Sequence, residues 1–512
     1  MSVVQSVDNV ALLPAYLAAG TAVLVLLADL LVGRAGATVA VAGAGFVATG
    51  VGAVLVGSAG TRRTFCVGAD CSWVFDGRAA LIAGVFALLT LGVLGLSGPL
   101  LRGGPTPVGE YCFLLACSMT GGVVLGAAGD LITLIVALET LTLPLYVLVG
   151  LRRGSLASAE AAVTFFVVSV VATTVTLLGA ALLYAATGGL HLDRLGGLLA
   201  GAPDLPLIPA AVALVVLGLA FKVAAVPFHA WAPATYDGAP LPVAAYLSTA
   251  SKLGGVVALL AVVQRALPAE VTGPVLALLA VLTMTVGNLV ALRQRRTVRL
   301  LAWSSVAQAG YILAPLGVLA LAAGRAGEVR AGAYAATVAY AVFFVVVELA
   351  AFAALVALRP PGADGGTVAD LRGAARRRPW VGAALALALV GLAGLPPGLA
   401  GLFAKVTVVR ALLDGGAGWL ALVVAVNAVI GLAYYLRLAA TLYAGPVPLP
   451  TNLASAGEPT VPAGEPTVSV GEPAGVAPDR VAWPVTVALA GATALAVVIG
   501  FVPQVVLDLA AR

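Results

Sequence analysis

All three lysines of the sequence lie inside apolar segments. Lys222, Lys252 and Lys405 have long apolar flanks on both sides, whereas the basic residues of the loops are arginines. Arginine stays protonated in proteins, but a buried lysine can release its proton. We therefore interpret the three lysines as candidate sites of proton exchange. Two other interpretations stay open, because a lysine can extend along its helix to the membrane surface or belong to a structural ion pair.

Two carboxylic acids also lie deep in apolar segments. Glu139 is near the middle of DLITLIVALETLTLPLYVLVG (130–150), and Glu348 interrupts AYAVFFVVVELAAFAAL. A close pair of opposite charges can keep both charges in apolar surroundings, whereas a single buried charge tends to neutralise. We expect Glu139 to pair with Lys222. The alternative is a neutral Glu139 that is hydrogen-bonded to a helix carbonyl.

Helix breakers accompany two of the lysines. Residues 221–252 read FKVAAVPFHAWAPATYDGAPLPVAAYLSTASK, and GLAGLPPGLAGLFAK leads to Lys405 about 180 residues after Lys222. The breakers are Pro227, Pro233, Pro240 and Pro242 in the first stretch, and Pro396 and Pro397 in the second. Interrupted helices in membranes occur where the freed backbone is enclosed by protein or lines a cavity. A broken helix with a buried lysine, found twice, predicts an internal repeat with an ion site in each half.

Several other polar residues fall in these apolar segments. His229 follows Pro227 by two residues, and a histidine can pass protons near neutral pH or serve a purely structural role. Ser304, Ser305 and Gln308 have no ionisable partner in the sequence. The hydroxyl residues of the segment at 159–187 either line a hydrated path or bond to their own helix, and the second interpretation is favoured.

Composition places these segments in a membrane. The chain has 512 residues, of which 62% are hydrophobic and only 10% are charged. About fourteen apolar stretches are long enough to span a bilayer, so we predict an all-α polytopic membrane protein without a soluble domain. The net charge of +5 is spread along the chain and gives no support for nucleic-acid binding.

The loops differ in their arginine content. When loops are assigned alternately, one side receives Arg34, Arg102, Arg152, Arg153, Arg293, Arg295, Arg296, Arg299, Arg359, Arg372, Arg376, Arg377 and Arg378. The other side receives fewer, among them Arg62, Arg63, Arg194, Arg265, Arg325 and Arg330. The positive-inside rule makes the first side cytoplasmic and puts both termini outside.

The four cysteines show no haem or iron–sulfur spacing and no metal signature. Cys66 and Cys71 share one loop on the predicted outer side. A disulfide and two free thiols are both compatible with this location. Cys112 and Cys117 lie together in one apolar segment.

The motifs resemble one known family. They are ALETLTLPLYVL around Glu139, FKVAAVPFHAWAPATYDGAP around Lys222, STASK ending at Lys252, GNLVALRQRRTVRLLAWSSVAQAGY, and GLPPGLAGLFAK ending at Lys405. Together they resemble the antiporter-like proton-pumping subunits of respiratory NADH-quinone oxidoreductase (complex I), most closely its subunit N. The resemblance covers most of residues 110–440.

The resemblance implies fourteen transmembrane helices with two inverted five-helix repeats, the seventh and twelfth helices being broken. The implied division is helices 1–3 in 1–109, the first repeat in 110–265, the second repeat in 266–443, a flexible Pro/Gly loop in 444–479, and a C-terminal helix in 480–512. By the same resemblance, Glu139 and Lys222 form a coupled pair, Lys252 lies on a central hydrated axis, and Lys405 faces the second half-channel.

The sequence departs from the family pattern at four positions. The family commonly has Lys at Thr164, Lys at Arg299, His at Gln308 and Asn at Glu348. The missing lysine at Thr164 leaves open how protons enter the first half-channel. Glu348 would either supply a titratable group elsewhere or pair with Lys405.

The resulting hypothesis is a multi-pass subunit in the bacterial inner (plasma) membrane that moves protons outward while other subunits oxidise NADH and reduce quinone. It would contact neighbouring membrane-arm subunits, lipid and protons, and would hold no cofactor or metal itself. Proton transfer would use Glu139, Lys222, Lys252 and Lys405, with His229 and Glu348 as further candidates. The alternatives are a subunit of a multisubunit cation/proton antiporter and a non-pumping structural subunit.

Overall fold

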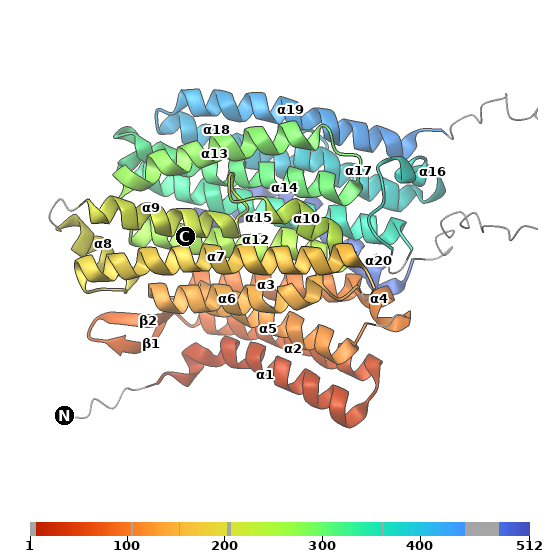
Figure 1. The fold of residues 1–512 in the computed structure, drawn as a ribbon, viewed down its shortest axis with the longest axis horizontal. Helices are drawn as coiled ribbons and strands as arrows, with labels where there is room; N and C mark the ends of the chain where they lie inside the picture. Colours follow the sequence, from red (N-terminus) through yellow and green to blue (C-terminus); the bar gives the residue numbers. More distant parts are fainter. Residues whose placement is uncertain are drawn as a thin grey trace, which may run out of the picture.

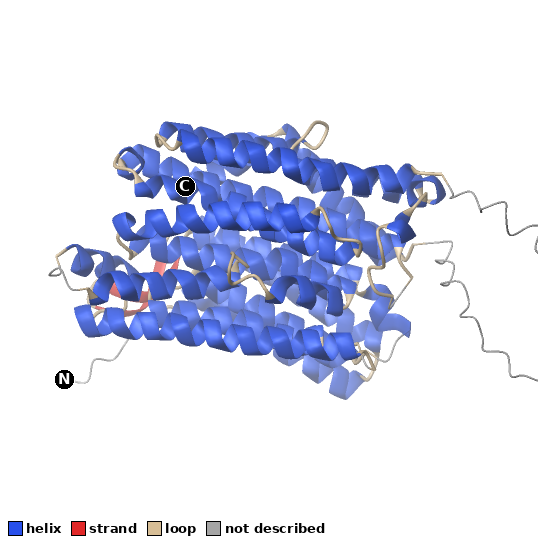
Figure 2. Ribbon diagram, turned by 45° about the horizontal axis from the view of Figure 1, so that its top comes forward, coloured by secondary structure: helices blue, strands red, loops and turns tan. Residues whose placement is uncertain are grey.

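The computed structural model describes residues 7–103, 106–152, 154–201, 206–360, 363–445 and 481–511. The predicted Pro/Gly loop at 444–479 lies outside these residues from position 446 onward. The described chain is a bundle of long helices that run side by side along one axis (Figure 1). Nearly all of it is helical (Figure 2). Helices suit a bilayer because each one satisfies its own backbone hydrogen bonds.

Twelve segments are long and apolar enough to cross a membrane. They are Asn9–Val32 (α1), Ala35–Ser58 (α2), Gly77–Leu96 (α3), Val108–Gly126 (α5), Leu131–Val149 (α6), Leu156–Thr187 (α7), Leu241–Arg265 (α11, η1 and α12), Ala269–Ala291 (α13), Thr297–Ala320 (α14 and η2), Gly327–Leu358 (α15), Gly418–Tyr443 (α19) and Trp483–Phe501 (α20).

Two further crossings are each made by a pair of shorter helices. The first pair is α9 (Leu207–Lys222) and α10 (Trp231–Gly238), and the second is α17 (Pro379–Ala393) and α18 (Leu399–Asp414). Together with the twelve continuous spans, the described chain makes fourteen crossings. The prediction of a polytopic helical bundle with two broken helices is confirmed.

Short elements join these helices at the two ends of the bundle. They are β1 (Arg62–Val67), β2 (Asp70–Phe75), α4 (Gly98–Gly103), α8 (Leu192–Ala200), η3 (Ala323–Arg325), η4 (Ala369–Leu371), α16 (Ala374–Arg377) and α21 (Pro503–Ala511). The hairpin and α8 lie at one end of the bundle, and α4 and α16 lie at the other (Figure 1). We call these the hairpin end and the arginine end.

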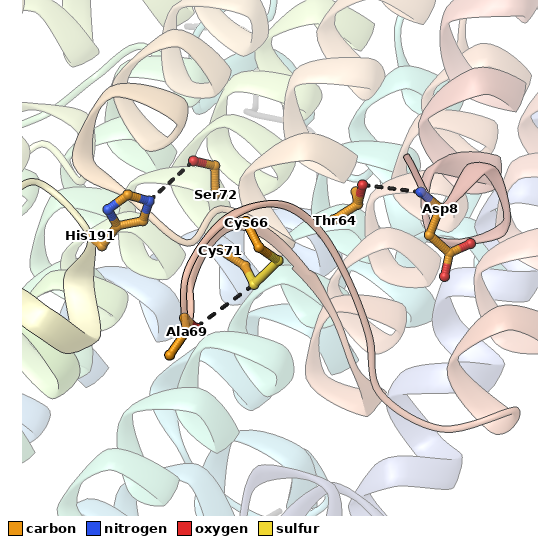
Figure 3. The surroundings of a disulfide bond; sticks show 7 residues. All are labelled: Asp8, Thr64, Cys66, Ala69, Cys71, Ser72 and His191. Atoms are coloured by element: carbon orange, nitrogen blue, oxygen red, sulfur yellow. Dashed lines mark hydrogen bonds between the residues drawn. A yellow bond between two sulfur atoms is a disulfide. The ribbon is translucent and has the colours of Figure 1, made fainter. Parts of the chain in front are cut away.

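The hairpin end differs from the all-helical expectation, because β1 and β2 form a two-stranded antiparallel sheet. Cys66 lies opposite Cys71 in the register, and the two are joined by a disulfide (Figure 3). The backbone N–H of Asp8 donates to Thr64 Oγ1 at 3.1 Å, so the start of α1 is fixed to this hairpin. The loop is polar and short, so the apolar periodicity that reveals a membrane helix does not show the hairpin.

The C-terminal segment also differs from the prediction. The resemblance implies one C-terminal helix in 480–512, but α20 ends at Phe501 and α21 begins at Pro503. Proline cannot donate the backbone hydrogen bond that would continue the first helix, and its ring clashes with the preceding turn.

At the arginine end, outside the spans, one arginine forms ion pairs with two aspartates. Arg296 Nε lies 2.6 Å from Asp237 Oδ2, at the end of α10, and Arg296 Nη2 lies 2.9 Å from Asp364 Oδ2. The hydrogen bond with Asp237, followed by that with Asp364, raises the pKa of Arg296 above its usual value. The second half of the broken helix α9/α10 is thereby tied to the loop between α13 and α14.

Helices α14 and α15 form the interior of the bundle. In the hydrophobic windows of their spans, 94% and 83% of the residues are buried. In contrast, only 28% of the residues are buried in α20. Polar residues on α14 and α15 therefore lie away from lipid, in the part of the molecule where an ion site is shielded.

Candidate functional site

Glu139 on α6 and Lys222 on α9 form the expected ion pair. Lys222 Nζ lies 2.7 Å from Glu139 Oε1, and only 6% of the lysine side chain and 21% of the glutamate side chain are exposed. Lys222 is the last residue of α9, so the break in the helix lies directly beside the ion pair. The alternative of an unpaired Glu139 is not what the structure shows.

Hydroxyl groups surround this pair. Thr173 Oγ1 on α7 donates to Glu139 Oε1 at 2.6 Å. Lys222 Nζ donates to Ser169 Oγ at 3.0 Å and to Thr142 Oγ1 at 3.2 Å. Apart from their contact with each other, Lys222 and Glu139 are thus hydrogen-bonded to three hydroxyl groups. A hydroxyl can both accept and donate a proton.

The break after Lys222 satisfies its freed backbone groups inside the protein. The carbonyl of Phe221 accepts from Trp231 Nε1 at 3.2 Å, and the N–H of Val226 donates to Thr283 Oγ1 at 3.0 Å. The first four connecting residues, 223–226, are buried, whereas Pro227 and Ala230 further along the connection are exposed. The start of the break, beside Lys222, is therefore a fixed element of the interior, as expected for irregular backbone at membrane depth.

Lys252 begins α12, directly after a π-helix at Leu247–Ser251 (η1). Its ammonium donates to both the carbonyl and the hydroxyl of Ser305 on α14, each at 2.6 Å. Short π-helical segments occur often at functional sites, because they displace the following side chains from the regular helical face. Here the segment sets the direction of Lys252 toward α14.

Gly255 brings this lysine close to the first ion pair. A Cβ atom at position 255 would lie 2.7 Å from the carbonyl carbon of Lys222 and 2.8 Å from its oxygen. Only glycine allows α12 to approach the end of α9 this closely. Lys252 and Gly255 are three residues apart and so share one face of α12. The face that carries Lys252 thus packs on the backbone of Lys222.

Lys405 on α18 contacts the second helix break, between α17 and α18. Its ammonium donates to the carbonyl oxygens of Leu392 at 2.8 Å and Ala393 at 2.6 Å, which end α17. A cation at the C-terminus of a helix is favourable, because unpaired carbonyls there carry partial negative charge. Gly394 follows with φ +81°, and a Cβ atom there would lie 2.9 Å from Lys405 Nζ. Position 394 therefore requires glycine both for its positive φ and because the Lys405 side chain occupies the space of a Cβ atom.

A polar network leads from Lys252 toward Lys405. Ser304, next to the partner of Lys252, accepts from Tyr435 Oη at 3.0 Å, and that Oη accepts from Gln308 Nε2 at 3.0 Å. Gln308 Nε2 also donates to the Leu392 carbonyl at 3.0 Å, the same oxygen that Lys405 contacts. Tyr340 Oη donates to Gln308 Oε1 at 2.6 Å. Gln308 therefore connects Ser304, through Tyr435, with the carbonyl that Lys405 contacts, and Ser304 is related to Lys252 only as the neighbour of Ser305 in the sequence.

A second group of polar side chains lies beside Lys405. Lys405 Nζ is 5.4 Å from the ring centroid of Tyr311, whose Oη accepts from Asn288 Nδ2 at 3.1 Å. Asn288 Oδ1 in turn accepts from Tyr434 Oη at 3.0 Å. The second half of the molecule thus surrounds its lysine with tyrosines and amides, whereas the first half uses a carboxylate and small hydroxyls.

The remaining candidates fall in different places. His229 is half-buried in the α9–α10 connection, and its ring lies 5.0 Å from that of Trp303, so it is not part of the described lysine contacts. Thr164 is exposed on α7, while Thr173 of the same helix contacts Glu139. Glu348 is completely buried on α15. Neither of its oxygens has a hydrogen-bond partner among the described residues, and the ammonium of Lys405 contacts backbone carbonyls, so this structure does not show the pairing with Lys405.

Sequence reasoning missed most of the second-half network. Tyr311, Tyr340, Tyr434 and Tyr435 were not singled out, although tyrosines inside apolar segments are a usable indication of buried hydroxyls. The carbonyls of Leu392 and Ala393 leave no mark in the residue types, because every residue has a carbonyl. Only the break at Pro396 and Pro397 points to free acceptors there.

Comparisons with known proteins agree in one family. Residues 128–431 match the family model described as "NADH:quinone oxidoreductase/Mrp antiporter, TM". The NADH-quinone oxidoreductase subunit N of Salinispora tropica is 79% identical, and the alignment covers 100% of both chains. A chain in a structure of respiratory complex I from Thermus thermophilus matches with a TM-score of 0.75 and 30% identity, covering 97% of this chain and 99% of that one.

A solved structure of an Mrp complex from a Dietzia species contains a further similar chain. It matches with a TM-score of 0.80 and 23% identity, covering 98% of this chain and 96% of that one. At this identity the likeness concerns the fold alone.

Proposed function

The chain belongs to the family of membrane subunits shared by NADH:quinone oxidoreductases and Mrp antiporters, and from this premise we propose how its buried charges move protons. It is an antiporter-like membrane-arm subunit of NADH-quinone oxidoreductase, and it assembles with other subunits of that complex. We propose that it carries protons outward through Glu139, Lys222, Lys252 and Lys405. The 2.7 Å contact of Glu139 with the buried Lys222, beside a helix break, is the observation that carries this proposal.

The charge state of Lys222 depends on whether its pair is closed. With Glu139 Oε1 at 2.7 Å, the opposite charge compensates for the loss of water around the ammonium. If a conformational change separates the two groups, a charged lysine is left in apolar surroundings and gives up its proton. Reclosing the pair favours uptake of a new proton.

The released proton has a next acceptor in the same interior. Lys252 lies on the helix face that packs on the Lys222 backbone and donates to Ser305 Oγ. The hydroxyls of Ser304 and Tyr435 lie next along the proposed route, and Gln308 holds Tyr435 near the carbonyl that Lys405 contacts. Serine and tyrosine hydroxyls both donate and accept. We assign Gln308 the role of holding Tyr435 and Tyr340 in place, because an amide does not readily exchange protons.

We assign the redox reactions to other subunits of the complex. Cys66 and Cys71 are joined to each other, and the sequence has no haem or iron–sulfur spacing. We also propose that the hairpin end faces outward. The disulfide suits an oxidising compartment, and the loops of the opposite end carry most of the arginines.

The test is NADH-driven proton pumping in sealed membrane vesicles that contain the whole complex. Glu139→Gln and Lys222→Met should each lower the pumping rate at least about tenfold, because a difference of about 1.4 kcal/mol already changes an equilibrium tenfold. Glu160→Gln is the matched control, since Glu160 is exposed on α7. Wild-type pumping in both site variants would contradict the mechanism.

The same vesicles separate the two alternatives. A cation/proton antiporter would exchange sodium for protons without NADH, so sodium-driven proton flux in the absence of NADH would favour it. The Dietzia Mrp match supports the fold of such a protein and no more. A structural subunit would instead lose assembly on native gels whenever it lost pumping.

A further inference from the structure

Glu348 is a buried carboxylate that has no hydrogen-bond partner in the described part of the chain. Its side chain lies on α15 with 0% exposure, and neither Oε1 nor Oε2 receives a hydrogen bond. Placing a carboxylate in apolar surroundings is costly unless it is paired or neutral. A residue retained at such a position therefore has either a partner that approaches at times or a proton of its own.

Lys252 is the cation that faces this carboxylate. Phe344 precedes Glu348 by four residues, so both lie on one face of α15. The ammonium of Lys252 lies 5.8 Å from the ring centroid of Phe344, which places it over the same face. Helix α12, which begins with Lys252, packs against α15, and no ion-pair contact joins Lys252 to Glu348 in the described part of the chain.

Lys252 has the capacity for one more acceptor. An ammonium has three N–H groups, and the two hydrogen bonds of Lys252 both go to Ser305. Tyr236 on α10 and Tyr435 on α19 are also close enough for the charge of Glu348 to act on them. Tyr435 belongs to the network in which Gln308 contacts the Leu392 carbonyl beside Lys405.

We propose that Glu348 and Lys252 are a second carboxylate–lysine pair, and that Glu348 accepts the proton of Lys252 on its way to Lys405. This inference rests on the proposed function. In the step, an N–H bond of the Lys252 ammonium breaks and an O–H bond forms on Glu348. The charged pair becomes a neutral amine and a neutral carboxylic acid, so total charge and atoms are conserved.

Such a step lets Lys252 accept a second proton before the first has reached Lys405. Neutralisation removes both charges from the interior at once, which avoids leaving one buried charge uncompensated. It also gives the centre of the molecule the same kind of pair that Glu139 and Lys222 form in the first half. The pair of the first half is closed in this structure, and the central pair is open.

The first experiment compares Glu348→Gln with Glu328→Gln in the assembled complex. Glu328 is an exposed residue in the first turn of the same helix, so the chemical change is identical but remote from Lys252. We expect Glu348→Gln to assemble normally and to lower NADH-driven pumping at least about tenfold. Glu328→Gln should leave both unchanged. Normal pumping in Glu348→Gln would overturn the inference, and so would a loss of pumping that merely follows a loss of assembly.

A second measurement does not depend on pumping. In Lys252→Met, the cation is gone and Glu348 should hold a proton permanently. The infrared spectrum of this variant should therefore contain a protonated-carboxyl band that is missing from Lys252→Met/Glu348→Gln. Identical spectra of the two variants would refute the coupling of the two residues.

These outcomes are distinct from failure of the proposed function. If Glu139→Gln and Lys222→Met abolish pumping but Glu348→Gln does not, proton transfer stands and only the central pair is refuted. If none of the three variants lowers pumping, the proposed function itself fails.

Discussion

Replacing Gly394 by alanine should displace the ammonium of Lys405 without changing its charge. Gly394 has φ +81°, and a Cβ atom built there would lie 2.7 Å from Cδ and 2.9 Å from Nζ of Lys405. Both distances are shorter than van der Waals contact. The long lysine side chain can move more easily than the backbone of the break, so we expect the side chain to leave its position.

The displacement removes interactions of known size. Lys405 Nζ donates to the carbonyls of Leu392 and Ala393 at 2.8 and 2.6 Å. A hydrogen bond that involves a charged group contributes about 1.5–3 kcal/mol. Losing one of the two therefore lowers the fraction of molecules whose Lys405 ammonium lies at these carbonyls about tenfold or more. The left-handed backbone of a non-glycine residue costs a further 1–2 kcal/mol or so.

Gly188→Ala is the matched control for the backbone cost. Gly188 ends α7 with φ +67°, and a Cβ atom there would meet no atom within 4 Å. The two variants should assemble to a similar extent on native gels, because both carry the left-handed alanine. NADH-driven pumping in vesicles should fall at least about tenfold in Gly394→Ala only. Equal pumping in the two variants would refute the assignment of Lys405 to the proton route.

Two further predictions concern the first half and the orientation of the chain. Thr173→Val removes the hydroxyl that donates to Glu139 Oε1 at 2.6 Å. Because one hydrogen bond to a charged group contributes about 1.5 kcal/mol or more, we expect this variant to pump severalfold more slowly. Thr174→Val, which changes an exposed hydroxyl bonded to its own helix, should pump normally, and equal rates would contradict the role of Thr173. A membrane-impermeant maleimide should label Cys66 and Cys71 from outside intact cells only after reduction, with Cys66→Ser/Cys71→Ser as the blank. Labelling of these cysteines only in inverted vesicles would reverse the proposed orientation.

The residue types alone were enough for the first ion pair. Glu139 and Lys222 carry opposite charges in apolar segments, and in a membrane such charges have few alternatives to pairing. The two broken helices could be predicted for a similar reason, since several prolines cluster at each break and each one removes a helical hydrogen bond, whereas a single proline such as Pro144 leaves α6 continuous. Charge and helix breaking act locally, so the sequence displays them directly.

The partners of Lys252 and Lys405 could not be predicted in this way. Lys252 contacts Ser305, and Lys405 contacts two backbone carbonyls, and neither kind of acceptor stands out from many others in the sequence. Glu348 was identified as a deep acid, but its partner depends on which face of α15 meets α12. That relation is fixed by packing between distant segments, including the close approach at Gly255.

The expected role of Thr164 shows the same limit. The family commonly has a lysine at this position of α7, which made it a candidate for the first half-channel. In the structure the Thr164 side chain is exposed, and α7 contacts Glu139 through Thr173. Nine residues separate the two, so they face different directions around the helix axis. The division of the chain into two inverted repeats remains a prediction.

The most direct test of the central claim compares single and double variants of the first ion pair. Removing one member of a buried pair leaves an uncompensated charge, whereas removing both avoids that cost. Glu139→Gln/Lys222→Met should therefore assemble better than either single variant. If the pair handles protons, the double variant still fails to pump when NADH is oxidised in sealed vesicles. Restoration of wild-type pumping together with assembly would show that the pair serves only to hold the protein together.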